Sequence, residues 1–181
     1  MTTLILIDIQ TGFDDPVWGP RNNPEAETNA GRLLAHARTA DWGVIHIRHA
    51  SHTPGSPLSG DGLAFKPEVT PLPHEPIFEK SVNSAFIGTD LEDRLRASRE
   101  TDLVICGLTT PHCVSTTTRM AANLGFTVTL AHDACAAFAA NADTSWAGLP
   151  PMSAEDSHIT AVSHLHGEFA SARSVGDILG L

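Results

Sequence analysis

Three side chains suited to covalent catalysis stand where hydrophobic segments of the chain end. Asp8 ends one such segment, Lys80 follows another, and Cys113 begins a predicted helix. A carboxylate can accept a proton, an ammonium group stabilises negative charge, and a thiol becomes a nucleophile once it loses its proton. If the three side chains meet in space, they form a site for attack on a carbonyl group.

Cys113 is expected to be the reactive cysteine of the three in the chain. The free N–H groups and the positive end of the helix dipole favour a thiolate, so we expect the pKa of Cys113 to be lowered. Cys106 and Cys135 fall in apolar segments and are expected to be small buried side chains. The odd count and the lack of a CxxC pair argue against a disulfide framework and a thiolate zinc site.

Each of these residues also has a purely structural interpretation. On position alone, Lys80 is also typical of a solvated loop cation, Asp8 of an acid that caps the loop at 11–23, and Cys113 of an unreactive buried thiol. Lysine and aspartate are seldom buried without a partner. The combination of base, cation and nucleophile at strand ends is therefore more specific than any one of the three.

Apolar segments alternate with helix-like spacing along the chain. Six strands are expected, at residues 3–9, 44–47, 77–78, 102–106, 126–130 and 169–172. This alternation favours an α/β fold, a single three-layer domain over 1–181 with a mostly parallel six-stranded sheet flanked by helices. Sites in such sheets form at the carboxyl ends of the strands, where the three candidate residues are expected.

Capping residues mark where the helices begin. Asn23, which is followed by proline, predicts the start of a helix that runs to about residue 40. Thr89 begins a capping box, and Ser153 begins a later helix with Ile159 on its apolar face. Residues 50–76 are rich in Pro, Gly and Ser, and a loop of that length is usually functional.

Composition excludes several classes of protein. Eleven basic residues against 21 acidic ones give a net charge of −10, which argues against binding to nucleic acid. The apolar segments are far shorter than the roughly 20 residues of a membrane span, and the N-terminus lacks the pattern of a signal peptide. We therefore expect a cytoplasmic protein that acts on a small molecule.

Four segments resemble the isochorismatase-like cysteine hydrolases, a family that includes nicotinamidases, N-carbamoylsarcosine amidases, biuret hydrolases and isochorismatases. The segments are LILIDIQTGF at 4–13, HIRHASHTPGSPL at 46–58, FEKSVNSAFIGTDLEDRL at 78–95 and ICGLTTPHCVSTTTRMAANLGF at 105–126. The resemblance implies a six-stranded parallel sheet, a homo-oligomer (dimer or tetramer), and an Asp-Lys-Cys triad at Asp8, Lys80 and Cys113. It also implies an oxyanion hole built from the N–H groups of Thr109 and Cys113, with a cis peptide bond between 108 and 109.

The expected metal site of nicotinamidases is not evident in this sequence. The segment after the second strand contains His46, Arg48, His49 and His52 but lacks their Asp-x-His pair. We therefore expect no metal and no other cofactor, with His49 as a hydrogen-bonding group in the pocket. A metal held by His49 and His52 is the alternative, because a spacing of three can place two ligands together.

Several residues are candidates for contact with the substrate. Phe13 and Trp18 offer apolar surface and Arg21 a partner for a carboxylate, all from the loop after Asp8. Phe86 is a further candidate, with ordinary core packing as its alternative; Phe138 is a similar one. His112 adjoins Cys113 and is expected to be a pocket wall or surface residue rather than the catalytic base.

The function favoured by these residues is hydrolysis of a C–N bond in a small amide, carbamoyl or ureido compound, through a thioester on Cys113. One alternative is an isochorismatase-type vinyl-ether hydrolase, whose chemistry does not need the cysteine. Others are a non-catalytic oligomeric small-molecule-binding protein and a redox sensor, since a low-pKa thiol also oxidises readily.

Overall fold

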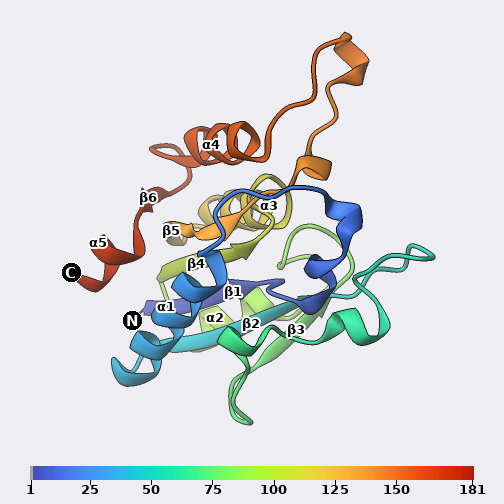
Figure 1. Ribbon diagram of the computed structural model, residues 1–181. Coiled ribbons are helices and arrows are strands. Elements are labelled where there is room, and N and C mark those ends of the chain that lie inside the picture. Colours follow the sequence, from blue (N-terminus) through green and yellow to red (C-terminus); the bar gives the residue numbers. More distant parts are fainter. Residues whose placement is uncertain (1) are drawn as a thin grey trace.

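A computed structural model describes residues 2–181 of the chain (Figure 1). Six parallel strands form one sheet in the order β3-β2-β1-β4-β5-β6. The strands are β1 (Thr2–Ile7), β2 (Gly43–His49), β3 (Ile77–Lys80), β4 (Asp102–Leu108), β5 (Thr127–Ala136) and β6 (Ser171–Arg173). The α/β fold with a six-stranded sheet is confirmed, and every strand pair is parallel.

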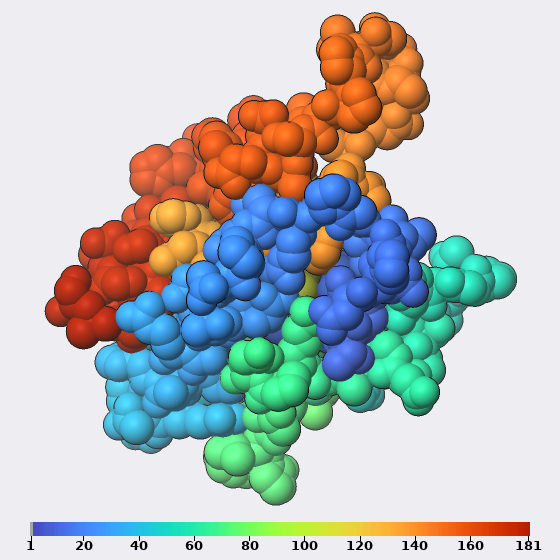
Figure 2. Space-filling model, viewed as in Figure 1, coloured from blue at the N-terminus to red at the C-terminus, as the bar shows by residue number. Residues whose placement is uncertain are grey.

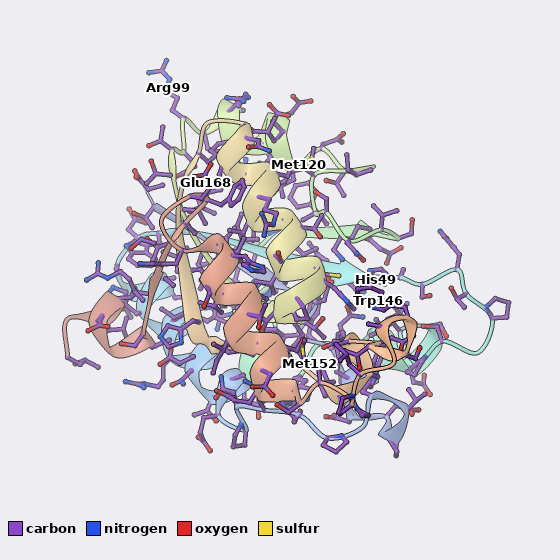
Figure 3. The ribbon with its side chains drawn as sticks, turned by 90° about the horizontal axis from the view of Figure 1, so that it is seen from above. His49, Arg99, Met120, Trp146, Met152 and Glu168 are labelled. Carbon is purple, nitrogen blue, oxygen red and sulfur yellow. The ribbon has the colours of Figure 1, made fainter. Side chains whose placement is uncertain are left out.

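Helices cover both faces of the sheet, which buries the apolar strands between two layers. One face carries α1 (Ala26–Thr39) and α5 (Val175–Leu179), which contact each other and β5. Right-handed crossovers place α2 (Leu91–Ala97), α3 (Ser115–Asn123) and α4 (Ala154–Leu165) on the opposite face. Figure 3 shows α3 and α4 side by side on that face.

Short helical turns shape the loops at the carboxyl end of the sheet. They are η1 (Thr11–Asp14), η2 (Pro16–Trp18), η3 (Gly60–Leu63), η4 (Pro67–Val69), the π-helical η5 (Thr110–Val114), η6 (Ala139–Asn141) and η7 (Ser145–Ala147). The long loop predicted at 50–76 therefore contains η3 and η4. This loop pairs with the segment after β1 through two backbone hydrogen bonds. The Thr11 N–H donates to the Ala64 carbonyl, and the Lys66 N–H donates to the Ile9 carbonyl.

Three local predictions were wrong. Asn23 does not cap α1, because its side chain donates instead to the carbonyls of Asp133 and Cys135. Thr89 forms no capping box, since its hydroxyl donates to the Ala85 carbonyl. Ile159 is exposed, because α4 buries a face made of small and polar residues together with Leu165. In each case the tertiary surroundings override the local signal.

Residues 143–150, between η6 and α4, stand away from the body of the molecule (Figures 1 and 2). They include η7, whose Trp146 is 86% exposed, and Leu149 is exposed beside it. Large exposed apolar side chains often mark surfaces that contact another molecule. The predicted homo-oligomer nevertheless stays a prediction, because the structure contains one chain.

Across residues 2–181, none of the helices has the length and apolar character needed to cross a membrane.

Candidate active site

The order of the strands brings four functional side chains together at the carboxyl ends of neighbouring strands, which we call the carboxyl edge of the sheet. Lys80 ends β3, His49 ends β2, Asp8 follows β1, and Cys113 follows β4, and these four strands are neighbours. The chain leaves β1 in one direction across the sheet and leaves β4 in the other. Such a point of divergence is where α/β sheets place their ligand sites.

The ammonium group of Lys80 contacts each of the other three side chains. Its Nζ lies 2.6 Å from Asp8 Oδ2, 3.0 Å from His49 Nδ1 and 3.3 Å from Cys113 Sγ. An ammonium has three N–H donors and no acceptor, so all three donors are engaged. Both charged side chains of the Lys80–Asp8 pair are fully buried, which fixes the three groups relative to one another.

Asp8 is turned into the site by an unusual backbone conformation. Its φ is +51°, a left-handed value that diverts the chain from the line of β1. Next to it, Gly107 of β4 has a φ of +129°, and a Cβ there would lie 2.0 Å from the Ile7 carbonyl oxygen. Only glycine permits this close approach of the two backbones.

One carboxylate oxygen of Asp8 has no hydrogen-bond partner. Oδ2 accepts from Lys80, whereas the buried Oδ1 accepts from no group among residues 2–181. Burial raises the pKa of Asp8, and the neighbouring Lys80 charge opposes that rise. A carboxylate oxygen of Asp8 lies within 4.8 Å of the Cys113 sulfur, which makes Asp8 a candidate acceptor for the thiol proton.

Cys113 lies in the π-helical turn η5, two residues before α3, rather than at the first residue of an α-helix. The Val114 N–H bonds to the Thr109 carbonyl, and the hydroxyl of Thr110 lies 2.8 Å from His158 Nδ1 on α4. Both members of the Thr110–His158 pair are buried. This pair attaches the turn that carries the cysteine to the helix behind it.

The expected lowering of the Cys113 pKa was wrong. Burial and then the negative charge of Asp8 raise the pKa of the thiol to about 12, and Lys80 offsets only part of this rise. The surroundings of Cys113 therefore favour the neutral thiol over the thiolate. Such a nucleophile is activated when a base accepts its proton during the reaction, and it does not need to be a thiolate beforehand.

The peptide bond between Leu108 and Thr109 is cis, as predicted. Thr109 and Cys113 both line a cavity of about 170 Å³ at this edge of the sheet. The lining residues are Phe13, Trp18, His49, Ser51, Ser56, Leu58, Asn83, Thr109, His112, Cys113 and Asn141. The cavity is smaller than the 300–1,000 Å³ of pockets for drug-sized ligands, so it suits a small molecule.

Comparison with known proteins identifies the family of the chain. Residues 2–156 match the isochorismatase domain, a range that includes all four side chains at the strand ends. The chain belongs to the isochorismatase family. Isochorismatase family protein YrdC of Bacillus subtilis (strain 168) is 44% identical over 180 residues, covering 97% of this chain and 93% of YrdC.

Two further relatives extend the likeness. A crystal structure of an isochorismatase-family protein from Chromobacterium violaceum ATCC 12472 has a TM-score of 0.93 and 45% identity, covering 99% of this chain and 92% of that one. A streptothricin hydrolase of Streptomyces noursei is 36% identical over 146 residues, which are 75% of this chain and 49% of that protein. The predicted family is confirmed, and the chain is an isochorismatase-family hydrolase.

Two residues predicted to meet the substrate lie elsewhere in this hydrolase. Arg21 is engaged by Glu27 through two bonds of 2.8 and 2.9 Å, so its guanidinium is not free for a substrate carboxylate. Phe86 is buried in the core, where it stacks on Phe126 with ring centroids 6.1 Å apart. Neither residue lines the cavity.

The aromatic residues of the first loop do reach the cavity of the hydrolase. Phe13 and Trp18 line it, and their ring centroids are 5.0 Å apart. Phe138 stacks behind Phe13 at 5.7 Å, which supports the wall without lining it. The Trp18 indole N–H bonds to the Gly12 carbonyl at 2.8 Å, which fixes the ring.

The histidines of β2 do not converge on a common point. His46 and His49 lie on opposite faces of the strand; His46 bonds to Glu75, His49 approaches Lys80, and His52 is exposed. A second set of possible ligand atoms, from Asp8, His49 and Cys113, lies within 4.8 Å of one another. The Lys80 ammonium already contacts all three members of that set, so these residues do not fit a metal ion beside it.

Reasoning from the sequence missed several wall residues and one support of the hydrolase site. Ser51, Ser56, Leu58, Asn83 and Asn141 line the cavity from three separate loops. Gln10, the one glutamine of the chain, is fully buried and binds the backbone of His49. A polar amide three residues after the buried strand β1 was the available signal for Gln10, whereas the loop residues carried none.

Proposed function

We propose that this hydrolase cleaves a C–N bond in a small amide, carbamoyl or ureido compound, with Cys113 as nucleophile, Asp8 as proton acceptor and donor, and Lys80 as the organising cation. The observation that carries the proposal is the contact of one buried ammonium with the carboxylate and the sulfur, at 2.6 and 3.3 Å. A base, a nucleophile and a group that orients both are the parts that covalent catalysis requires.

In the first half of the reaction, the Cys113 sulfur attacks the carbonyl carbon of the substrate while Asp8 accepts the thiol proton. A C–S bond forms, and the π electrons of the carbonyl move onto its oxygen. The positive charge of Lys80 stabilises the sulfur as its proton leaves. The raised pKa of Asp8 suits a carboxylate that must hold this proton for a time.

The tetrahedral intermediate then collapses. The C=O bond forms again, the C–N bond breaks, and the proton on Asp8 passes to the leaving nitrogen, which departs as ammonia or an amine. Water next attacks the thioester and gives a proton to Asp8, the C–S bond breaks, and Asp8 returns a proton to the sulfur. The product is a carboxylic or carbamic acid, and the enzyme is restored.

The negative oxygen of the intermediate needs hydrogen-bond donors at its own position. We assign that role to the backbone N–H groups of Thr109 and Cys113, the two residues of the catalytic turn that line the cavity. Loss of one such donor costs about 2.7–4 kcal/mol of transition-state stabilisation in other enzymes. The relative named streptothricin hydrolase supports hydrolysis as the reaction class.

The test is release of ammonia from a panel of small primary amides, carbamoyl compounds and ureides. We expect turnover by the native chain and a loss of at least 1,000-fold in Cys113→Ala, with an unchanged circular dichroism spectrum. Cys106→Ala is the matched control, because it removes a buried thiol outside the site and should keep activity. The acyl-enzyme should appear as a mass increase on the peptide that contains Cys113.

A folded and active Cys113→Ala protein would overturn covalent catalysis. Activity on a vinyl ether in that variant would instead favour the isochorismatase-type reaction. Binding of a ligand without turnover by the native chain would favour a non-catalytic binding protein.

A further inference from the structure

The cavity wall contains no side chain with a permanent charge. Among residues 2–181, its lining consists of aromatic, aliphatic, hydroxyl, amide and imidazole groups and the Cys113 thiol. Burial, together with the charges of Lys80 and His52, lowers the pKa of His49 to about 4, so its ring is neutral near pH 7. A ligand in the cavity therefore meets hydrogen-bonding groups and apolar surface rather than a fixed cation.

Lys80 and the cations associated with the first loop are already engaged by carboxylates of the protein. Lys80 gives its three donors to Asp8, His49 and Cys113. Arg21 forms its two-bond pair with Glu27, and Lys66 bonds to Asp14 at 2.6 Å and to Glu27 at 2.9 Å. Lys80 cannot reach a ligand without leaving its partner Asp8, nor Lys66 without leaving Asp14. Arg21 can do so only by breaking both of its bonds to Glu27.

A carboxylate on the substrate would enter this cavity without a counter-ion. Removing an unpaired anion from water is strongly unfavourable, and a cavity offers it weaker solvation than bulk solvent does. The Lys80 ammonium at the base of the site is already paired with the buried Asp8 carboxylate, so it is not free to bind a second anion, and the whole chain carries −10. All three factors act against an anionic substrate.

The polar groups of the wall match an uncharged amide instead. The side-chain amides of Asn83 and Asn141 and the hydroxyls of Ser51 and Ser56 each offer both a donor and an acceptor. An amide or ureido group presents the same two functions. Asn83 Oδ1 lies 3.8 Å from the Cys113 sulfur, so one of these amides adjoins the reacting atom.

We infer that the site selects substrates by charge: the compound hydrolysed at Cys113 is an uncharged amide or ureide that carries no carboxylate. The inference rests on the proposed function, and it narrows the substrate class of that reaction. It excludes N-carbamoyl amino acids and other carboxylate-bearing amides as preferred substrates.

The test uses two alkylating reagents of nearly equal size. Iodoacetamide is neutral and iodoacetate carries a carboxylate, and both transfer their carbon to a thiol with loss of iodide. Labelling of native protein is followed at pH 8.5, well above the pKa of about 4 of His49, and Cys113 is quantified by mass spectrometry. The ratio of the two rates is divided by the same ratio for free cysteine.

We expect the normalised ratio to favour iodoacetamide by at least tenfold. In Ser56→Lys, which adds a cation to the cavity wall, the preference should fall at least threefold. Ala40→Lys is the matched control: it makes the same change in net charge at an exposed position after α1, at the opposite edge of the sheet. That variant should keep the native ratio within twofold.

A normalised ratio near one in the native protein, or a preference for iodoacetate, would overturn the inference of charge selection and leave the proposed catalysis intact. Equal effects of Ser56→Lys and Ala40→Lys would also overturn it, because the preference would then arise from net charge alone. Failure of both reagents to label Cys113 faster than Cys106 would overturn the proposed nucleophile, and the charge inference with it.

Discussion

The side-chain amide of Gln10 binds both backbone polar groups of His49. Its Oε1 accepts from the His49 N–H at 2.7 Å, and its Nε2 donates to the His49 carbonyl at 3.1 Å. The β1–β2 ladder ends at Ile7 and Ile47, because Asp8 turns away with a positive φ. The amide thus replaces the strand residue that would have paired with His49, and β2 continues to the point where the imidazole meets Lys80.

We predict that Gln10→Leu lowers kcat/KM by about 10- to 100-fold, because an unsatisfied buried backbone group costs about 1–3 kcal/mol and His49 loses its position. Gln10→Glu keeps the acceptor for the His49 N–H but loses the donor. Hydrogen exchange at the His49 amide separates the two effects: protection should be lost in Gln10→Leu and kept in Gln10→Glu. Unchanged protection in Gln10→Leu would show that the amide does not hold this residue.

His49 should contribute to the acid limb of the pH–rate profile. Its pKa is lowered to about 4 by burial and by Lys80, so it is neutral above that pH and accepts from Lys80 through Nδ1. Protonation removes that acceptor and places two positive charges together. We predict that the acid limb of kcat/KM reports uptake of two protons, one by Asp8 and one by His49 near pH 4, and uptake of only one proton in His49→Asn.

The asparagine retains an acceptor for Lys80 and does not titrate, so the variant should stay active at neutral pH. A two-proton acid limb in His49→Asn would assign the second proton to another group. Circular dichroism at each pH checks that the chain remains folded.

Arg21 should matter for stability and not for turnover. The Arg21–Glu27 pair joins the loop after β1 to α1, and without Arg21 the buried Glu27 would keep only Lys66 as a charged partner. We predict that Arg21→Met lowers the free energy of unfolding by about 1–3 kcal/mol, which shifts Tm by roughly 3–10 °C in a domain of this size. Its kcat/KM should change less than threefold.

Arg99→Met is the control for loss of one positive charge, since Arg99 is exposed and points into solvent (Figure 3). It should leave both Tm and activity near the native values. A large rise in KM for Arg21→Met with an unchanged Tm would show that Arg21 binds the substrate and would contradict this prediction.

Acid should destabilise the chain through Glu75. Burial alone would raise the pKa of Glu75, but bonds from Arg38, the Leu72 N–H and His46 outweigh it and lower that pKa to about 2. A carboxylate whose pKa is lower in the folded state stabilises it above the unfolded pKa of about 4.5. That contribution, about 3 kcal/mol, is lost as the pH falls from 4.5 towards 2.

Burial also lowers the pKa of His46, so the folded state holds it neutral and loses further stability as the pH falls below about 6.5. Urea unfolding at pH 7, 5 and 3.5 measures these effects. We predict that Glu75→Gln is less stable than the native chain at pH 7 and that the difference narrows at pH 3.5. A constant difference across this range would show that Glu75 does not titrate as described.

The sequence predicts those site residues whose positions are set by the ends of the strands. Asp8, Lys80 and Cys113 each follow an apolar segment, and parallel strands align their carboxyl ends, so local patterns suffice to bring them to one edge. The pKa of Cys113 could not be predicted in this way. Its direction depends on burial and on the distance to Asp8, which no local pattern contains.

The errors concern side chains whose partners come from distant segments. Asn23 has a capping residue's chemistry but meets the carbonyls of β5, 110 and 112 residues away. Ile159 has helical spacing, but α4 packs against η5 and α3 through its other face, which contains Ala161. Which loop residues line the cavity, such as Ser56 and Asn141, depends on how three loops fold over one edge.

The wide separation of the site residues along the chain affects how the protein regains activity after unfolding. Asp8 and Lys80 are 72 residues apart in the sequence, and Lys80 and Cys113 are 33 apart. Each of these pairs therefore joins side chains from different strand ends. No short peptide of this chain can therefore be active. In a refolding experiment, turnover can recover only after β3, β2, β1 and β4 have paired. Its recovery should therefore be slower than the recovery of the helical circular dichroism signal.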